Sequence, residues 1–306
     1  LERVCRLLCD RDALEVLVVD VGSPASSRVS VEPYRDRVNI EVVAQPHSGP
    51  AVARNLGAAR ARGTYLAFLD DDCWPAPEWL EQLAEAFAAH AGREAIVGGR
   101  TENALSDNTF SEASELIVGY LVKTRLPDGT RFFPTNNLAV RSEAFLRIGG
   151  FSARYPMAGG EDREFCRRWQ EHGHAAVDAP KAVVYHAHSL TLGSFLRQQF
   201  TYGRGAALFH AGTGAPRGDG LPRLGAFHVN LLRYPFTRAT PYAWRHLVLV
   251  LLSQVSENRE LAHVFDDLFD AEGSEIYLKP AGDYVEPGRE VTFYTVVEAA
   301  RRRGEV

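Results

Sequence analysis

Three consecutive carboxylates, Asp70, Asp71 and Asp72, follow directly after the apolar run 65–69. Adjacent like charges repel one another, so such a cluster favours a bound cation unless water solvates it fully. Oxygen ligands suit Mg²⁺ or Mn²⁺, and either ion bridges the oxygens of a diphosphate. The triplet therefore predicts a metal-dependent diphosphate site. Taken alone, it is explained as well by an acidic turn that faces solvent.

A second pair of carboxylates, Glu161 and Asp162, follows two glycines and opens a stretch with helical periodicity. Asp162 shares one face of that helix with Trp169 and lies in the first turn, where the helix dipole favours the ionised carboxylate. A carboxylate in this place can act as a general base, and the indole can wall a site or stack on a sugar. Ordinary charge at a helix start and core packing of the indole remain the alternatives.

Two histidines, His186 and His188, follow the apolar run 181–185, which predicts a strand. Strand alternation directs both imidazoles to the same side. An imidazole there can complete the coordination of a cation held by Asp72, or bind a diphosphate. The alternative is a pair of polar residues at the end of a strand.

The elements that must position these groups alternate along the chain. Apolar and helical patterns predict strands over 14–20, 39–44 and 65–69 and helices over 50–62 and 76–90. This order predicts an α/β fold with a mostly parallel, doubly wound sheet, which binds ligands at the carboxyl ends of its strands. The segment 106–131 shows no readable pattern, and we expect loops there that set specificity.

Composition narrows the class of protein. The chain has 306 residues with 34 basic and 39 acidic side chains, a net charge of −5, which gives no support to a nucleic-acid-binding surface. Its four cysteines form no CxxC pair, so free thiols in a reducing compartment are expected. The longest apolar run, 246–255, is about half of what a membrane span needs. We expect a cytoplasmic protein, at most peripheral at the inner face of a membrane, whose true start precedes Leu1.

Several motifs resemble family 2 glycosyltransferases of the GT-A fold. They are VVD with GS at 18–23, SGPAVARN at 48–55, AFLDDD at 67–72, TNNLAVR at 135–141, IGGF at 148–151 and GEDREFCRRW at 160–169. A later segment, RQQFTYGRG at 197–205, is similar to the region that follows the sheet in this family. The resemblance covers about residues 1–245 and implies a GT-A, Rossmann-like domain of mostly parallel sheet and flanking helices.

The resemblance also implies a reaction and a site. An inverting enzyme of this kind moves a sugar from a nucleoside-diphosphate sugar to a hydroxyl of a glycan, lipid or small molecule, with Mg²⁺ or Mn²⁺. Asp162 would be the catalytic base. The implied donor-binding residues are Asp20, Arg54, Asn55, Asp70, Asp71 and Arg204; acceptor-binding residues are Asn136, Asn137, Glu161 and Trp169; metal ligands are Asp72 and His186.

The chain departs from the family pattern in two places. The strand with a Pro-Thr-Tyr-Asn-like motif that normally opens the family is not found from Leu1 onward. The usual Asp-Asp-Gly-Ser reads Asp20-Val21-Gly22-Ser23, which removes one carboxylate from recognition of the base.

The tail has a different character. From about residue 253 it resembles the cytosolic region of the Castor/Pollux ion-channel family, without a pore helix. We therefore expect a second unit, a small α/β extension over 246–306 joined by fusion to the domain 1–245. The alternative function is a catalytically inactive nucleotide-binding or regulatory module.

Overall fold

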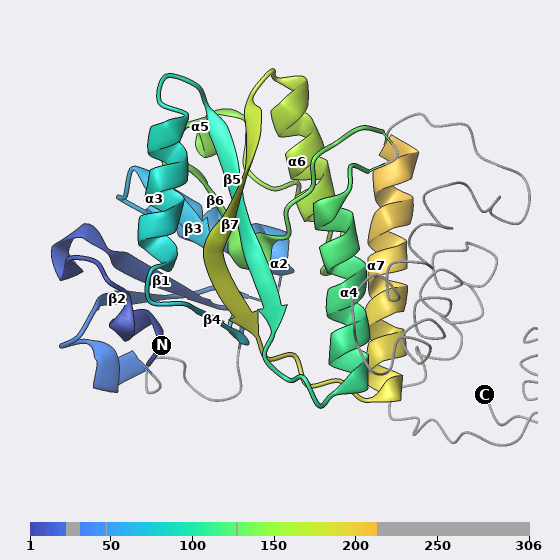
Figure 1. Cartoon of the computed structure of the whole chain (residues 1–306), viewed down its shortest axis with the longest axis horizontal. Helices are drawn as coiled ribbons and strands as arrows, with labels where there is room; N and C mark the ends of the chain where they lie inside the picture. Colours follow the sequence, from blue (N-terminus) through green and yellow to red (C-terminus); the bar gives the residue numbers. More distant parts are fainter. Residues whose placement is uncertain (23–30, 47, 127, 213–306) are drawn as a thin grey trace, which may run out of the picture.

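The computed structural model describes residues 1–22, 31–46, 48–126 and 128–212 (Figure 1). The strands are β1 (Glu15–Asp20), β2 (Asn39–Ala44), β3 (Tyr65–Phe68), β4 (Cys73–Pro75), β5 (Ala95–Asn103), β6 (Leu138–Arg141) and β7 (Ala175–His186). The helices are α2 (Pro50–Arg60), α3 (Trp79–Ala89), α4 (Thr109–Lys123), α5 (Ser142–Arg147), α6 (Glu161–Glu171) and α7 (Leu192–Gly212). Short 3₁₀ turns are Val4–Arg6, Arg11–Ala13, Glu32–Tyr34 and Thr135–Asn137.

The predicted α/β class is confirmed, but the expectation of a mostly parallel sheet is corrected. The main sheet has the order β3-β6-β5-β7-β4, and only β5 and β7 within it run parallel. The mixed direction arises from two short strands, β4 directly after the acidic turn and β6 within the motif at 135–141, which pair antiparallel with their neighbours. Strands β1 and β2 form a separate parallel pair.

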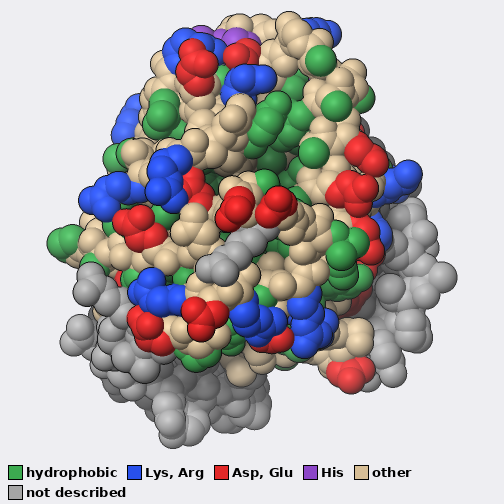
Figure 2. All heavy atoms as spheres, turned by 90° about the vertical axis from the view of Figure 1, so that its left-hand side faces the viewer, with side chains coloured by type: hydrophobic (Ala, Val, Ile, Leu, Met, Phe, Trp, Pro, Cys, Tyr) green, Lys and Arg blue, Asp and Glu red, His purple; other side chains and the backbone are tan. Residues whose placement is uncertain are grey.

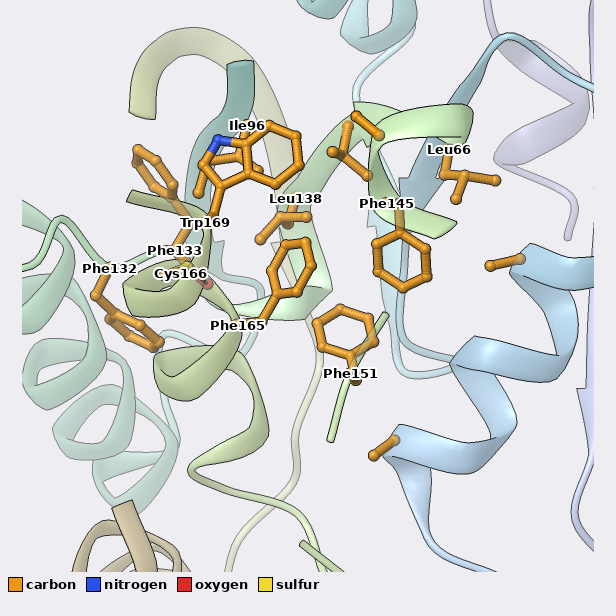
Figure 3. Packing of buried hydrophobic residues seen from close by; sticks show 14 of the residues in the cluster. Leu66, Ile96, Phe132, Phe133, Leu138, Phe145, Phe151, Phe165, Cys166 and Trp169 are labelled. Carbon is orange, nitrogen blue, oxygen red and sulfur yellow. Dashed lines mark hydrogen bonds between the residues drawn. The ribbon is translucent and has the colours of Figure 1, made fainter. Parts of the chain in front are cut away.

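Alternation along the strands supplies a core on each face of the main sheet. On one face, Trp79 and Leu83 of α3 pack with Val97 of β5. On the other face, α2, α5 and α6 cover a cluster rich in aromatic rings, including Phe145 and Phe165 (Figure 3). The sheet is therefore the middle layer of three. The helices on its two faces hold the ends of β3 and β7 in place.

Helices α4 and α7 pack against each other beside the sheet (Figure 1). Helix α4 corrects the expectation of loops over 106–131. The side chain of Asn108 caps it by accepting hydrogen bonds from the amides of Phe110 and Ser111. Its buried Leu116 and Tyr120 pack with Phe195 of α7. A capped start and an apolar face make this segment a helix.

The remaining expectations concern the cysteines, membrane-spanning segments and the tail. The thiols of Cys5, Cys9, Cys73 and Cys166 are unpaired. Within the described residues, no helix is both long and apolar enough to cross a membrane. The boundary at 245 and the extension over 246–306 lie outside the described residues and stay predictions. On the face shown in Figure 2, basic and acidic side chains lie intermixed.

Helix α7 approaches the loop before α6 so closely that only glycine fits at Gly205. A Cβ at this position would overlap the backbone carbonyl of Gly159. We expect Gly205→Ala to lower the free energy of unfolding by about 1–3 kcal/mol, the usual cost of overpacking. Gly119→Ala is the matched control, because a Cβ there meets nothing within 4 Å and a helical glycine costs about 0.5–1 kcal/mol against alanine. Urea denaturation should show a lower free energy of unfolding for Gly205→Ala and a higher one for Gly119→Ala.

Candidate active site

The acidic turn and the end of β7 are brought together by strand pairing. Strand β4, which follows the turn, pairs antiparallel with β7 so that Cys73 faces His186. The backbone carbonyl of Asp72 accepts a hydrogen bond from the amide of Ala187 at 2.9 Å. Two motifs more than a hundred residues apart in sequence thus share one edge of the main sheet.

Three side chains at this edge form a group that can hold a metal ion. Ligand atoms of Asp72, His186 and His188 all lie within 4.8 Å of one another. Nε2 of His186 lies 3.3 Å from Oδ2 of Asp72. One carboxylate oxygen and two imidazole nitrogens suit Mn²⁺ better than Mg²⁺, which prefers oxygen ligands and retained waters. The donor set therefore fits the cation that the sequence predicted.

The charges within this group support one another. Burial works against the charge of Asp72, but the hydrogen bond with His186 brings the pKa of the carboxyl below its ordinary value. Burial likewise opposes a charge on His186, yet Asp72 and Glu115 together raise the pKa of its imidazole to about 10. Without a metal ion, a proton on His186 supplies the positive charge that this acidic site requires.

A second cluster lies where α2 meets the start of α6. The guanidinium of Arg54 donates to Oδ1 of Asp70 at 2.8 Å and to Oε1 of Glu161 at 3.0 Å. Glu161 has a side-chain exposure of only 3 %, and its other oxygen accepts from the amide of Gly159 at 2.8 Å. Burial opposes the charge on Arg54, but Asp70 and Glu161 raise the pKa of the guanidinium. Arg54 therefore joins the acidic turn to the carboxylate pair on α6.

Asp162 lies in the first turn of α6, next to this ion pair. Its Oδ1 accepts from the amide of Arg163 at 2.8 Å. Burial raises the pKa of Asp162, although Arg163 and Arg54 act in the opposite direction. Burial and the neighbouring charge of Asp162 also raise the pKa of Glu161. Increased proton affinity suits a carboxylate that acts as a general base.

Helix α7 closes the site with polar side chains that were not predicted. Gln198 donates through Nε2 to Nδ1 of His188 at 3.0 Å and to the hydroxyl of Tyr202 at 3.2 Å. Burial raises the pKa of Tyr202, and the charges of Asp70 and Asp162 raise it further. The phenol thus lies within the electrostatic reach of both carboxylate clusters. The motif at 197–205 was noted in the sequence, but only contacts across helices could single out these two residues.

Three of the predicted donor residues lie elsewhere around these clusters. Asp20 ends β1, at the carboxyl edge of the smaller sheet, and is partly buried. Asp71 is exposed at the middle of the acidic turn. Arg204 is exposed on α7 and lines a small hollow with Tyr155 and Met157. Their roles stay predictions.

Three of the predicted side chains make contacts that hold the fold, and their binding roles stay predictions. The amide of Asn55 donates to and accepts from the backbone of Phe151 at 2.7 and 2.8 Å. Asn137 is fully buried, accepts from the indole of Trp79 and donates to two backbone carbonyls. Trp169 has no exposed surface for a sugar, so core packing, the alternative left open, is what the structure shows (Figure 3).

Asn136 is constrained in a similar way. Only 7 % of its surface is exposed, and its Oδ1 accepts from the hydroxyl of Thr101 at 3.2 Å. A direct role in acceptor binding stays a prediction. Glu161, the remaining acceptor residue of the prediction, is buried against Arg54 and contributes to the arrangement of the site rather than to its surface.

Models of two protein families match parts of this chain. The model of the family described as "Glycosyl transferase family 2" matches residues 1–153, and "N-terminal domain of galactosyltransferase" matches residues 123–189. The "Pre-mycofactocin glycosyltransferase" of Mycobacterium tuberculosis is 36 % identical over 211 residues, covering 66 % of this chain and 43 % of the relative. Chondroitin synthase of Escherichia coli is 26 % identical over 216 residues, covering 58 % and 31 %. The chain spans less than half the length of these two relatives.

Among solved structures, the mannosyltransferase PcManGT from Pyrobaculum calidifontis, in complex with GDP-Man and Mn²⁺, has a TM-score of 0.51. The match has 18 % identity and covers 88 % of this chain and 74 % of the mannosyltransferase. It shows the likeness of the fold. The comparisons give no support to the expected likeness between the tail and the Castor/Pollux region, and that segment lies outside the described residues.

Proposed function

The chain belongs to glycosyl transferase family 2, and on that premise we propose that it transfers a sugar from a nucleoside-diphosphate sugar to an acceptor hydroxyl, with inversion and metal assistance. The observation that carries this proposal is that Arg54 pairs with Asp70 of the acidic turn and with Glu161 of α6, which brings two acidic clusters next to each other. One cluster, with Asp72 and His186, suits a cation and diphosphate. The other, with Glu161 and Asp162, suits a general base.

The donor side of the proposal rests on the edge where β4 meets β7. Asp72 and His186 would hold Mn²⁺ or Mg²⁺, with His188 close enough to contribute. When bound, such an ion neutralises the charge that develops on a departing diphosphate. Asp70 is fixed by Arg54 and would face the ribose of the donor. Asp20, at the end of β1, would face the nucleobase.

The chemical step is assigned to Asp162. Its carboxylate takes the proton of the acceptor hydroxyl while that oxygen forms a bond to the anomeric carbon. The bond from the same carbon to the diphosphate oxygen breaks on the opposite face, so the configuration inverts and the electron pair leaves with the diphosphate. Burial favours this role, because it raises the proton affinity of Asp162 above that of an exposed aspartate.

The acceptor and the cellular location stay predictions. A glycan, a lipid or a small molecule all offer the hydroxyl that the proposed step needs. Cytoplasmic location with peripheral contact at the inner face of a membrane is likewise an expectation from the sequence.

Calorimetric titration with nucleoside diphosphates, in the presence and absence of Mn²⁺, tests the donor site. We expect one nucleotide to bind in a Mn²⁺-dependent manner and its sugar derivative to be hydrolysed slowly without an acceptor. Binding without transfer or hydrolysis would favour the inactive nucleotide-binding module. If no nucleoside diphosphate bound with or without metal, the proposal would be wrong.

Asp72→Asn is expected to weaken Mn²⁺ and nucleotide binding together. The substitution keeps the shape of the side chain but removes the carboxylate charge beside His186, which is the charge that a cation would use. Asp107→Asn is the matched control, since Asp107 is exposed in the turn after β5 and is not among the three candidate metal ligands. Calorimetry of both variants should show at least a tenfold loss, in both affinities, for Asp72→Asn alone. Unchanged nucleotide affinity in Mn²⁺ would exclude the metal bridge.

A further inference from the structure

His186 lies between two carboxylates that approach it from opposite sides of its ring. Its Nε2 lies 3.3 Å from Oδ2 of Asp72, and its Nδ1 lies 3.4 Å from Oε2 of Glu115. The side chains of His186 and Glu115 are 17 % and 13 % exposed, so little water competes for either nitrogen. Asp72 belongs to the proposed metal site. Glu115 comes from α4 and contacts the other nitrogen of the ring, Nδ1.

Helix α4 holds Glu115 in this place through contacts of residues that precede it in the sequence. Asn108 caps the helix and also donates through Nδ2 to the carbonyl of Leu190 at 2.9 Å. One residue before Glu115, the hydroxyl of Ser114 donates to Gln198 of α7 at 2.9 Å. Ser111 donates to the backbone carbonyl of His188. The helix is therefore tied to the segment that carries both histidines.

We propose that Glu115 is a positioning residue for His186: its carboxylate accepts the Nδ1 proton and leaves the Nε2 lone pair directed at a divalent cation shared with Asp72. The inference rests on the proposed function, because it concerns the metal site of that reaction. A histidine that ligates a metal commonly donates its other ring proton to a carboxylate, which fixes the tautomer and the ring orientation. Glu115 occupies that place here.

The second histidine is held in a different way, which makes the role of Glu115 specific. An ionised carboxylate can only accept, so Glu115 requires a proton on Nδ1 of His186. Gln198 instead presents its amide nitrogen to Nδ1 of His188, which places the ring proton of neutral His188 on Nε2. When a cation takes the place of the proton between His186 and Asp72, the contact with Glu115 keeps the remaining ring proton of His186 on Nδ1 and leaves Nε2 as the ligand atom.

Mn²⁺ binding followed by electron paramagnetic resonance, without nucleotide, tests this inference in the full chain. We expect Glu115→Leu to lower Mn²⁺ affinity by about 10- to 100-fold, the usual effect of losing an outer-shell partner. Glu115→Gln should fall between parent and Glu115→Leu, because its amide oxygen can still accept the proton. Glu112→Gln is the matched control one turn earlier on α4, where the carboxylate accepts from Asn103 instead.

A spectroscopic signature separates positioning from a general structural effect. In spin-echo spectra of the parent, a histidine nitrogen should modulate the Mn²⁺ signal, and His186→Ala should remove that modulation. Glu115→Leu should reduce it, and adding this change to His186→Ala should cost no further affinity. Parental affinity and modulation in Glu115→Leu, or a full additional loss in the double variant, would overturn the inference. If the parent bound no Mn²⁺, the metal site of the proposed function would itself be wrong, and this inference with it.

Discussion

Asp162→Asn is expected to lower single-turnover transfer from a saturating sugar nucleotide by about 10²-fold or more while donor affinity stays at the parental level. Asparagine keeps the size of the side chain and its ability to accept from the amide of Arg163, so the first turn of α6 should persist. Unlike aspartate, asparagine has no carboxylate that can take up a proton. The acceptor hydroxyl then attacks without a base, and only the rate of the chemical step should fall.

Two further variants on α6 control this experiment. Glu171→Gln removes a carboxylate at the far end of the helix, where the side chain is 63 % exposed, and should leave transfer unchanged. Glu161→Gln should cost less than Asp162→Asn, because the role assigned to Glu161 is to pair with Arg54. Near-parental turnover in Asp162→Asn would contradict the assignment and direct attention to Glu161 or Asp71. An equal loss of donor affinity would mean that Asp162 is structural.

The elements predicted from strong local patterns are the ones that the structure reproduces. The strand at 39–44 has its predicted bounds, and the helix predicted over 50–62 ends two residues early, at Arg60. Direction and order of strands were less accessible, because they depend on pairing across long stretches of chain. Strands β4 and β6 have three and four residues, too few for alternation to reveal them.

The candidate site was predicted as a set of motifs, and its internal contacts were not. The turn at Asp70 to Asp72 and the pair at Glu161 were found because charged residues after apolar runs are conspicuous. That one guanidinium, Arg54, joins them follows only from the positions of α2, the acidic turn and α6 in the folded chain. Motif membership also cannot tell a ligand-facing amide from a structural one, and the hydrogen bonds that Asn137 makes within the fold could not be foreseen for that reason.

Glu115 was missed because its whole segment was read as loop. Helix α4 does carry a signal, since Asn108 stands at a capping position before a stretch with apolar residues at helical spacing. Detecting the helix would have placed a carboxylate on it, but not beside His186. That contact depends on how α4 lies against the end of β7, which no local pattern encodes.

Arg54→Met is expected to lower the free energy of unfolding by about 3 kcal/mol or more, the range for a buried ion pair that loses one partner. Methionine fills part of the volume of arginine but leaves Glu161, 3 % exposed, with backbone amides such as that of Gly159 in place of its cationic partner. Losing Arg54 costs less free energy at Asp70, because 35 % of that side chain is exposed to water. Adding Glu161→Gln to Arg54→Met should restore most of the loss, since a neutral amide needs no opposite charge.

Arg60→Met is the matched control on α2, where a side chain 54 % exposed lies 3.8 Å from Glu41, and it should change stability by about 0.5 kcal/mol at most.

The loss of stability in Arg54→Met should also depend on pH. Burial already raises the pKa of folded Glu161 above its ordinary value of 4.5, and loss of Arg54 raises it further. A raised folded pKa gives stability that is fully present below the unfolded value and is lost as pH rises through the folded value. Urea denaturation should therefore show a small deficit below about pH 4.5 that grows toward neutral pH, and a deficit independent of pH would mean that Arg54 acts through packing alone.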